Sequence, residues 1–283
     1  MSDSTWPAPA KLNLFLHILG RRADGYHRLQ TVFQFLEYAD ELDFEVVDDG
    51  RISIAGNLHD IPPEQNLIVR AAAMLKDYAG TKQGAIITFS KRIPVGGGLG
   101  GGSSDAATTL VALNKLWNIH LPMPTLAELG LALGADVPVF IHGSAAWAEG
   151  IGERLTPVSL PEGWFLIIHP GCSVPTARIF NIPDLTRNSS PITIRDFLGG
   201  AGHNDCESVV FREFPEIARA AEWLGERTRA RLTGTGACVF GRFDSKNAAQ
   251  AALTGLPREW QGFVSKGKNT SPLRERLGKA GDL

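Results

Sequence analysis

The chain reads Pro94-Val95-Gly96-Gly97-Gly98-Leu99-Gly100-Gly101-Gly102-Ser103-Ser104-Asp105-Ala106-Ala107 near its middle, and six of the seven residues from 96 to 102 are glycine. Holding so many glycines in one conformation costs considerable backbone entropy, so an ordered run needs a physical reason. We interpret it as a loop whose backbone N–H groups closely approach a bulky anion. The alternative is a flexible linker.

The residues on both sides of the run favour the anion-binding loop. Residues 85–89 predict a strand, and apolar residues recur at helical spacing from Ala106 to Trp117, which predicts a helix that begins near Ser103 or Ser104. Free N–H groups and the helix dipole at such a helix start attract phosphate. Linkers do not usually join a strong strand to a strong helix.

Two familiar glycine loops do not fit. A P-loop ends in Gly-Lys-Ser/Thr, and no lysine lies between Lys91 and Lys115. Residues 96–101 match G-x-G-x-x-G, but a dinucleotide site also needs an acidic residue about 20 positions further on. Residues 121–124 there read Leu-Pro-Met-Pro. The run therefore belongs to another class of nucleotide loop.

Composition describes a globular protein of one large or two ordinary domains. The chain has 283 residues, 43% hydrophobic and 20% charged, with a formal net charge of −2. This charge predicts no nucleic-acid partner, and the absence of a leader or a long apolar run predicts no membrane partner. Cys172, Cys206 and Cys238 form no C-x-x-C pair, which fits a reducing compartment without disulfides or zinc. We expect a cytoplasmic protein.

The first eighty residues predict mostly antiparallel sheet followed by a helix. We expect strands over 8–20, 29–36, 40–46 and 52–54, turns at 24–25 and 48–50, and a helix over 66–75 capped by Asn66 and ended by Gly80. Lys11 and Asn13 lie two residues apart in the first strand, so they point to the same side. That side is either a functional surface or an ordinary solvated strand face.

A candidate catalytic aspartate follows the second predicted helix after the glycine loop. This helix is expected to begin at a capping box formed by Thr125 and Glu128 and to end at Gly134. Asp136 then lies between that glycine and Pro138, on tightly fixed backbone. From local sequence alone, Asp136 is either a functional carboxylate or a capping aspartate.

The second half predicts a separate domain after the glycine and charged residues at 150–154, which gives domains 1–155 and 156–283, with the last residues able to pack back on the first domain. We expect strand 164–169, helices 204–213 and 215–225, strands 229–233 and 237–242, helix 245–255 and strand 260–265. With the two central helices as one layer, this order is the ferredoxin-like β-α-β-β-α-β motif. The fold class is α+β. Gly234 and Thr235 form either a ligand-facing turn or a plain hairpin turn.

Five segments carry a resemblance to a known family. In chain order they are Pro9-Ala-Lys-Leu-Asn-Leu14, Arg22-Ala-Asp-Gly-Tyr-His27, Pro94 to Ser104, Gly134-Ala-Asp-Val-Pro138 and Gly234-Thr-Gly-Ala237. They resemble the GHMP kinases (galactokinase, homoserine, mevalonate and phosphomevalonate kinases), and most closely the subgroup that acts on a cytidine diphosphate-linked methylerythritol. The chain departs from the superfamily loop in two extra glycines and in Asp105. The resemblance implies a two-domain fold, with a kinase domain on a ferredoxin-like domain.

The resemblance also implies an activity and its residues. ATP, with Mg²⁺, would phosphorylate the 2-hydroxyl of the methylerythritol part of a small-molecule substrate, as a step of isoprenoid precursor biosynthesis. Asp136 matches the catalytic base and Lys11 the lysine paired with it. The ATP-binding residues would be Pro94, Val95, Gly96, Gly97, Gly98, Leu99, Gly100, Gly101, Gly102, Ser103 and Ser104, with Asn66 and Lys91 on the adenosine side. Ser103 or Ser104 would lie near Mg²⁺.

The same resemblance assigns substrate contacts to Asn13, Tyr26, His27, Phe180, Gly234 and Thr235. Tyr26 and Phe180 are expected to hold the cytosine ring between them. Two alternatives stay open: a GHMP kinase for another small alcohol, and a non-catalytic nucleotide-binding sensor of the same fold. A sensor needs no base, so the presence of both Lys11 and Asp136 favours the enzyme. We expect a monomer or a weak homodimer.

Overall fold

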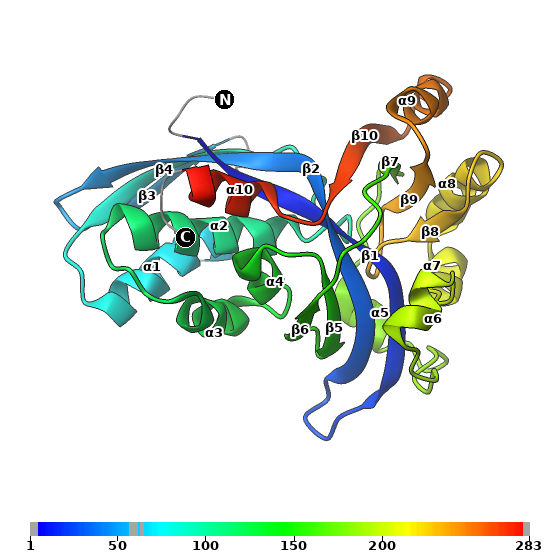
Figure 1. The fold of residues 1–283 in the computed structure, drawn as a ribbon, viewed down its shortest axis with the longest axis horizontal. Coiled ribbons are helices and arrows are strands. Elements are labelled where there is room, and N and C mark those ends of the chain that lie inside the picture. Colours follow the sequence, from blue (N-terminus) through cyan, green and yellow to red (C-terminus); the bar gives the residue numbers. More distant parts are fainter. Residues whose placement is uncertain (1–4, 57–61, 63–64, 280–283) are drawn as a thin grey trace.

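A computed structural model describes residues 5–56, 62 and 65–279. Its strands are β1 (Thr5–Arg21), β2 (His27–Val47), β3 (Ile52–Gly56), β4 (Gly84–Ser90), β5 (Ala146–Gly150), β6 (Arg154–Pro157), β7 (Trp164–His169), β8 (Ala230–Leu232), β9 (Val239–Phe243) and β10 (Gln261–Lys268). Its helices are α1 (Leu67–Ala79), α2 (Gly101–Leu116), α3 (Met123–Leu133), α4 (Val137–His142), α5 (Thr176–Phe180), α6 (Ile194–Leu198), α7 (Glu207–Glu213), α8 (Pro215–Gly225), α9 (Lys246–Thr254) and α10 (Pro272–Lys279). Figure 1 shows their arrangement.

The long hairpin of β1 and β2 runs through the whole molecule (Figure 1). Its turn lies at Asp24–Gly25, as predicted, with Gly25 at a φ of 89°. The prediction of two separate strands at 29–36 and 40–46 is wrong, because β2 continues unbroken through both ranges. Different partners cover its successive parts, first β5, then β10 and then β4, so no gap is left at which the strand must end.

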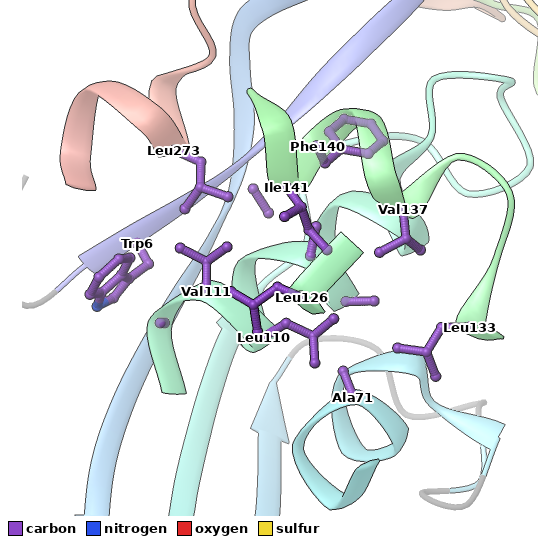
Figure 2. Close-up of a cluster of buried hydrophobic side chains, with 14 of the residues drawn as sticks. Trp6, Ala71, Leu110, Val111, Leu126, Leu133, Val137, Phe140, Ile141 and Leu273 are labelled. Atoms are coloured by element: carbon purple, nitrogen blue, oxygen red, sulfur yellow. The ribbon is translucent and has the colours of Figure 1, made fainter. Parts of the chain in front are cut away.

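The N-terminal half packs helices α1 to α4 against one side of the sheet formed by β1, β2 and β4 (Figure 1). Its core is a single cluster of buried apolar side chains from these helices and strands. Figure 2 shows that Leu273 of α10, from the far end of the chain, joins this cluster beside Trp6 and Val111. Helix α10 therefore completes the core of the N-terminal half.

The C-terminal half has the predicted ferredoxin-like order. Its strands lie in the order β10-β7-β9-β8 and all neighbouring pairs are antiparallel. Helices α8 and α9 pack against this sheet, with Ile217 and Leu224 of α8 in a second buried cluster. The α+β fold class is confirmed.

Two predicted helix starts need correction. Helix α2 begins at Gly101, before Ser103, because Gly100 caps it in a left-handed conformation with a φ of 73°. Helix α3 begins at Met123, so Thr125 does not form the predicted capping box with Glu128. Pro122 takes the cap position and a proline lies in the first turn, where a missing N–H costs nothing.

The two halves are joined by hydrogen bonding as well as by the chain. Strand β10 pairs mainly with β7, and its end at Gly267 and Lys268 pairs with β2. The division after residue 155 stays a prediction, and β6 spans that point.

The three cysteines are free. In the described ranges, no helix is both long and apolar enough to cross a membrane.

Candidate active site

A cavity of about 930 Å³ opens where the glycine loop, β1, the β1–β2 turn and α5 meet. It brings together nearly every candidate site residue from the sequence: Lys11, Asn13, Tyr26, His27, Asn66, Lys91, Pro94 to Ser103, Asp136, Phe180, Gly234 and Thr235. Ser104 is the exception, because its side chain is fully buried and does not line the cavity.

The glycine loop owes its conformation to three left-handed residues. Gly96, Gly98 and Gly100 have φ values of 70°, 74° and 73°. Gly98 is also tightly enclosed, since a Cβ there would lie 2.3 Å from the carbonyl oxygen of Thr233. Only glycine satisfies both conditions, and this lets the loop rest directly on the turn that follows β8.

The carbonyl groups of the loop point toward the protein. Those of Gly96 and Gly97 accept hydrogen bonds from the backbone N–H groups of Ala237 and Cys238, both 3.0 Å long. The Leu99 carbonyl accepts from the Lys11 N–H at 2.9 Å. By contrast, no N–H group from residue 96 to 103 donates to another residue in the described part of the chain. A row of unpaired donors that leads into the first turn of helix α2 is a site for phosphate.

Lys11 lies at the base of the cavity with only 3% of its side chain exposed. Its Nζ lies 3.3 Å from Asp136 Oδ2 and donates to the Gly98 carbonyl at 3.1 Å and to Asn13 Oδ1. An ammonium group has three hydrogens, so these three contacts use all of them. The structure thus brings Lys11, Asn13 and Asp136 together.

Asn13 links this lysine to Thr31, because the two ends of its amide bind different partners. Its Oδ1 accepts from Lys11, and its Nδ2 donates to Thr31 Oγ1 at 3.0 Å. Its backbone N–H donates to Thr233 Oγ1 at 3.1 Å, which ties β1 to the C-terminal half. The sequence marked Asn13 but gave no signal for Thr31 or Thr233.

Asp136 keeps about one third of its side chain exposed, at 35%, at the start of α4. The N–H of the next residue, Val137, bonds to the Gly134 carbonyl at 3.0 Å, which fixes the backbone on both sides. The carboxylate makes no hydrogen bond to the N–H groups of the helix it precedes. It is therefore free to accept a proton from a molecule in the cavity.

Lys91, expected on the adenosine side, is held in a buried cluster. Its Nζ lies 2.6 Å from Asp40 Oδ2 and 2.5 Å from Asp105 Oδ2. Asp105 therefore faces Lys91, which removes the repulsion that a carboxylate would otherwise exert on phosphate. Burial raises the pKa of Asp105 to about 7, with Lys91 opposing the rise and the charge of Asp40 adding to it. Asn66 lines the same part of the cavity and caps α1, as predicted.

The aromatic end of the cavity differs from the expected arrangement. Phe180 stacks on His27, with ring centroids 5.0 Å apart and an angle of 23° between the planes, while Tyr26 is 59% exposed. Arg187, which no sequence motif marked, donates from Nε to His27 Nε2 at 3.1 Å and from Nη2 to the Phe180 carbonyl at 2.8 Å. Burial and the charges of Arg187 and Arg21 lower the pKa of His27.

The turn at Gly234 and Thr235 faces the cavity. Asn204 fixes it by donating from Nδ2 to the carbonyls of Gly234 at 2.7 Å and Leu232 at 3.0 Å. Thr235 Oγ1 lies 3.0 Å from Thr176 Oγ1 of α5. Asn204 is a second positioning residue that the sequence gave no reason to select.

Comparisons with known proteins give the family. The models of the GHMP kinase N-terminal domain and of the GHMP kinase C-terminal domain match residues 66–144 and 183–262. The chain is 56% identical over 272 residues to the 4-diphosphocytidyl-2-C-methyl-D-erythritol kinase of Alkalilimnicola ehrlichii, covering 96% of this chain and 94% of that protein. The chain belongs to the 4-diphosphocytidyl-2-C-methyl-D-erythritol kinase family.

Another member of the 4-diphosphocytidyl-2-C-methyl-D-erythritol kinase family, from Nitrosococcus oceani, is 54% identical over 276 residues, 98% of this chain and 99% of that protein. A crystal structure of a 4-(cytidine 5'-diphospho)-2C-methyl-D-erythritol kinase superposes with a TM-score of 0.81 at 34% identity, covering 93% of this chain and 98% of that chain. A mevalonate kinase structure gives 0.69 at 17% identity, covering 94% of this chain and 99% of that chain, a likeness in fold alone.

Proposed function

We propose that the protein transfers the γ-phosphoryl group of ATP to the 2-hydroxyl of 4-diphosphocytidyl-2-C-methyl-D-erythritol, giving the 2-phosphate and ADP in isoprenoid precursor biosynthesis. The observation that carries the proposal is the Lys11–Asp136 pair, 3.3 Å apart, beside a glycine loop with unpaired N–H groups. A binding protein needs the loop but not the pair. Family membership supports the choice of substrate.

In the proposed step, the substrate oxygen attacks the γ-phosphorus while the bond from that phosphorus to the bridging β–γ oxygen breaks. The hydroxyl proton passes to a carboxylate oxygen of Asp136, and the electrons of the broken bond leave with ADP. Lys11 keeps the Asp136 carboxylate ionised before transfer, and its charge opposes the negative charge on the moving phosphoryl group. To contact that group, Lys11 exchanges one of its three present acceptors for a phosphoryl oxygen.

Oxygen donors at the end of the cavity that holds Lys11 and Asp136 fit the Mg²⁺ that accompanies ATP. Ser103 lines the cavity, as Asp136 does. The Ser103 Oγ also lies near Gly134, two residues before Asp136, since it would be 3.7 Å from a Cβ added to that glycine. Mg²⁺ prefers such hard ligands together with phosphate oxygens and water. Of the two serines that the sequence left open, Ser103 is therefore the proposed ligand. With Mg²⁺ bound, charge on the transferring phosphates is partly neutralised.

The cytidine would bind at the opposite end, against the stacked rings of His27 and Phe180. His27 Nε2 accepts from Arg187, so the proton of the neutral ring is assigned to Nδ1, which can donate to an acceptor on the base. The exposed ring of Tyr26 would cover the other face of the cytosine. Stacking on an aromatic ring contributes about 1–3 kcal/mol per base.

The test is mass analysis of the products after the protein is mixed with ATP, Mg²⁺ and one candidate alcohol at a time. We expect a phosphorylated 4-diphosphocytidyl-methylerythritol and no phosphorylated mevalonate or homoserine. Phosphorylation of another alcohol would identify a different GHMP kinase. Binding of ATP and the cytidine compound without product would identify a sensor. As a matched control, Asp136→Asn should bind ATP and give little product.

We further infer that the enzyme works in the cytoplasm as a monomer or a weak homodimer. The three free cysteines support a reducing compartment. The catalytic pair and the glycine loop come from one chain, so a second copy is not needed to complete this end of the site. Sedimentation at several protein concentrations measures the assembly directly.

A further inference from the structure

A second cavity, of about 300 Å³, lies apart from the first and shares no lining residue with it. It is a half-open hollow lined by residues of β1, β2, β7, β8 and β9 and of the end of α6. In Figure 1, α6 and the β1–β2 hairpin lie next to the C-terminal sheet that holds β7, β8 and β9. This volume is at the lower end of the range typical of small-molecule sites.

One wall of this cavity is strongly cationic. Arg229, Arg231 and Arg242 all line it, and no carboxylate does. Arg231 donates from Nη1 to the Leu14 carbonyl, which holds its guanidinium in place. Within the described residues, neither Arg229 nor Arg242 forms a salt bridge. Three guanidinium groups thus surround one hollow without a protein counter-charge in its wall.

Two of these arginines, Arg229 and Arg231, lie close enough to repel each other. Burial lowers the pKa of Arg231, and the nearby charge of Arg229 lowers it further, while Glu207 partly compensates. Glu207 is itself engaged, since its carboxylate accepts from the Leu232 N–H at 3.1 Å. A mobile anion in the hollow would relieve this repulsion.

The remaining walls are apolar. Leu160, Phe165 and Phe240 are buried side chains that face the hollow, and the exposed Leu198 lies at its edge. Gln34, 1% exposed, adds one polar group whose amide makes only a long 3.5 Å contact with the Pro161 carbonyl. A ligand that matches these walls has an anionic head and a short apolar body, with one group able to accept from an amide.

We propose that this cavity binds a small organic phosphate, with the phosphate between the guanidinium groups and a short aliphatic chain against the phenylalanines. Phosphate is preferred to a carboxylate because its two negative charges and three free oxygens can engage more than one guanidinium fork. The site goes beyond the proposed kinase reaction, which uses the first cavity.

The test is calorimetric titration of the full chain at low ionic strength with hexyl phosphate, inorganic phosphate and hexanol. Saturating ADP is present throughout, so that the glycine loop is occupied. We expect hexyl phosphate to bind more tightly than inorganic phosphate, and hexanol to show no binding. Equal binding of both phosphates would overturn the apolar half of the site, and no binding of either would overturn the site.

Variants of the two exposed arginines locate the binding. Arg229→Gln combined with Arg242→Gln should lower the affinity for hexyl phosphate by at least about tenfold, since two charge-assisted contacts are lost. Arg258→Gln with Arg219→Gln removes the same charge elsewhere on the C-terminal half and should leave binding unchanged. Equal weakening by both pairs would show non-specific attraction, and hexyl phosphate binding seen only in a parallel titration without ADP would place the binding in the first cavity. Both outcomes contradict the proposal.

Discussion

At the scale of single residues, the geometry around Lys11 explains why a buried lysine is tolerated in this fold. Its ammonium group lies between one carboxylate, one amide oxygen and one backbone carbonyl, so every hydrogen has an acceptor. A buried charge is costly unless it is paired and hydrogen-bonded in this way. The arrangement also fixes the Asp136 carboxylate at one end of the cavity.

Replacing Asp136 by asparagine should lower kcat by roughly 10²–10⁴ while leaving the affinity for ATP unchanged, because the amide cannot take the proton. Steady-state kinetics together with ATP titration measure both quantities. Asp77→Asn, on the surface of α1, is the matched control and should behave as the wild type. Full turnover in Asp136→Asn would exclude a role as base.

Asp105 should give the stability of the protein a characteristic pH dependence. Its pKa is about 7 when folded and about 3.9 in an unfolded chain, so the unfolded chain loses this proton over a range in which the folded protein keeps it. Stability should therefore fall as pH rises between these values. Between pH 5 and pH 8, the unfolding free energy of Asp105→Asn should therefore change less than that of the wild type, by on the order of 1–3 kcal/mol.

Urea unfolding of both proteins at the two pH values measures this difference. Identical pH profiles would show that Asp105 is already ionised in the folded protein at pH 5. The result also tests our explanation of Asp105, a carboxylate beside a phosphate-binding loop that the sequence did not explain. The structure explains it by the contacts of Lys91 with Asp105 and with Asp40.

At the scale of elements, the glycines of the loop differ in backbone conformation and in the space that each leaves for a side chain. Gly98 has a left-handed φ, and any Cβ there meets the Thr233 carbonyl, so Gly98→Ala should lower the melting temperature by at least about 3 °C. Gly102 has more room, because a Cβ there meets only Leu67 Cδ1 at 3.4 Å. Gly102→Ala should melt as the wild type does.

Gly102→Ala should nevertheless bind ATP more weakly, because its methyl group lies in the cavity wall near the unpaired N–H groups. Thermal melts and titration with a fluorescent ATP analogue separate the two effects. An unchanged melt in Gly98→Ala would show that the loop does not rest on the turn after β8. Unchanged ATP affinity in Gly102→Ala would show that phosphate stays away from this part of the helix start.

Helix α5 and the β1–β2 turn should together set the affinity for the cytidine substrate. Phe180→Ala and Tyr26→Ala should each raise KM for that substrate by roughly tenfold to a hundredfold, with little change in KM for ATP. Tyr78→Ala, an exposed tyrosine of α1, is the control. Because Phe180 stacks on His27, a melting curve must accompany the kinetics. Normal KM values in well-folded variants would mean that the rings do not contact the base.

The sequence predicted correctly those elements that depend on residues close to them in the chain. The strand at 164–169, the Asn66 cap and the helix ending at Gly134 all depend on nearby residues, and the structure has them as predicted. The continuity of β2 depends on three partner strands that are distant in sequence, so no local pattern revealed it. Arg187 and Asn204 were missed for the same reason, because Arg187 binds the His27 ring and Asn204 the Gly234 carbonyl, partners that are 160 and 30 residues away in sequence.

At the scale of the whole molecule, the last helix stabilises the half that begins the chain. Leu273 is 2% exposed in the N-terminal core (Figure 2), so Leu273→Ala should lower the unfolding free energy by about 2–5 kcal/mol. Leu198→Ala, 57% exposed on α6, should change it by less than about 0.5 kcal/mol. Urea unfolding measures both. Equal effects would show that α10 is not part of the folded core.

The placement of α10 also has a consequence for synthesis on the ribosome. The core that Trp6 enters is completed by Leu273, so the chain must be made as far as Leu273 before this core can close. The pairing of β10 with β2 adds a second contact between the two ends of the chain. Contacts of such long sequence separation slow folding and prolong the exposure of apolar surface. The nascent N-terminal half therefore keeps apolar surface exposed until Leu273 has been made, and we expect chaperones to bind it during that time.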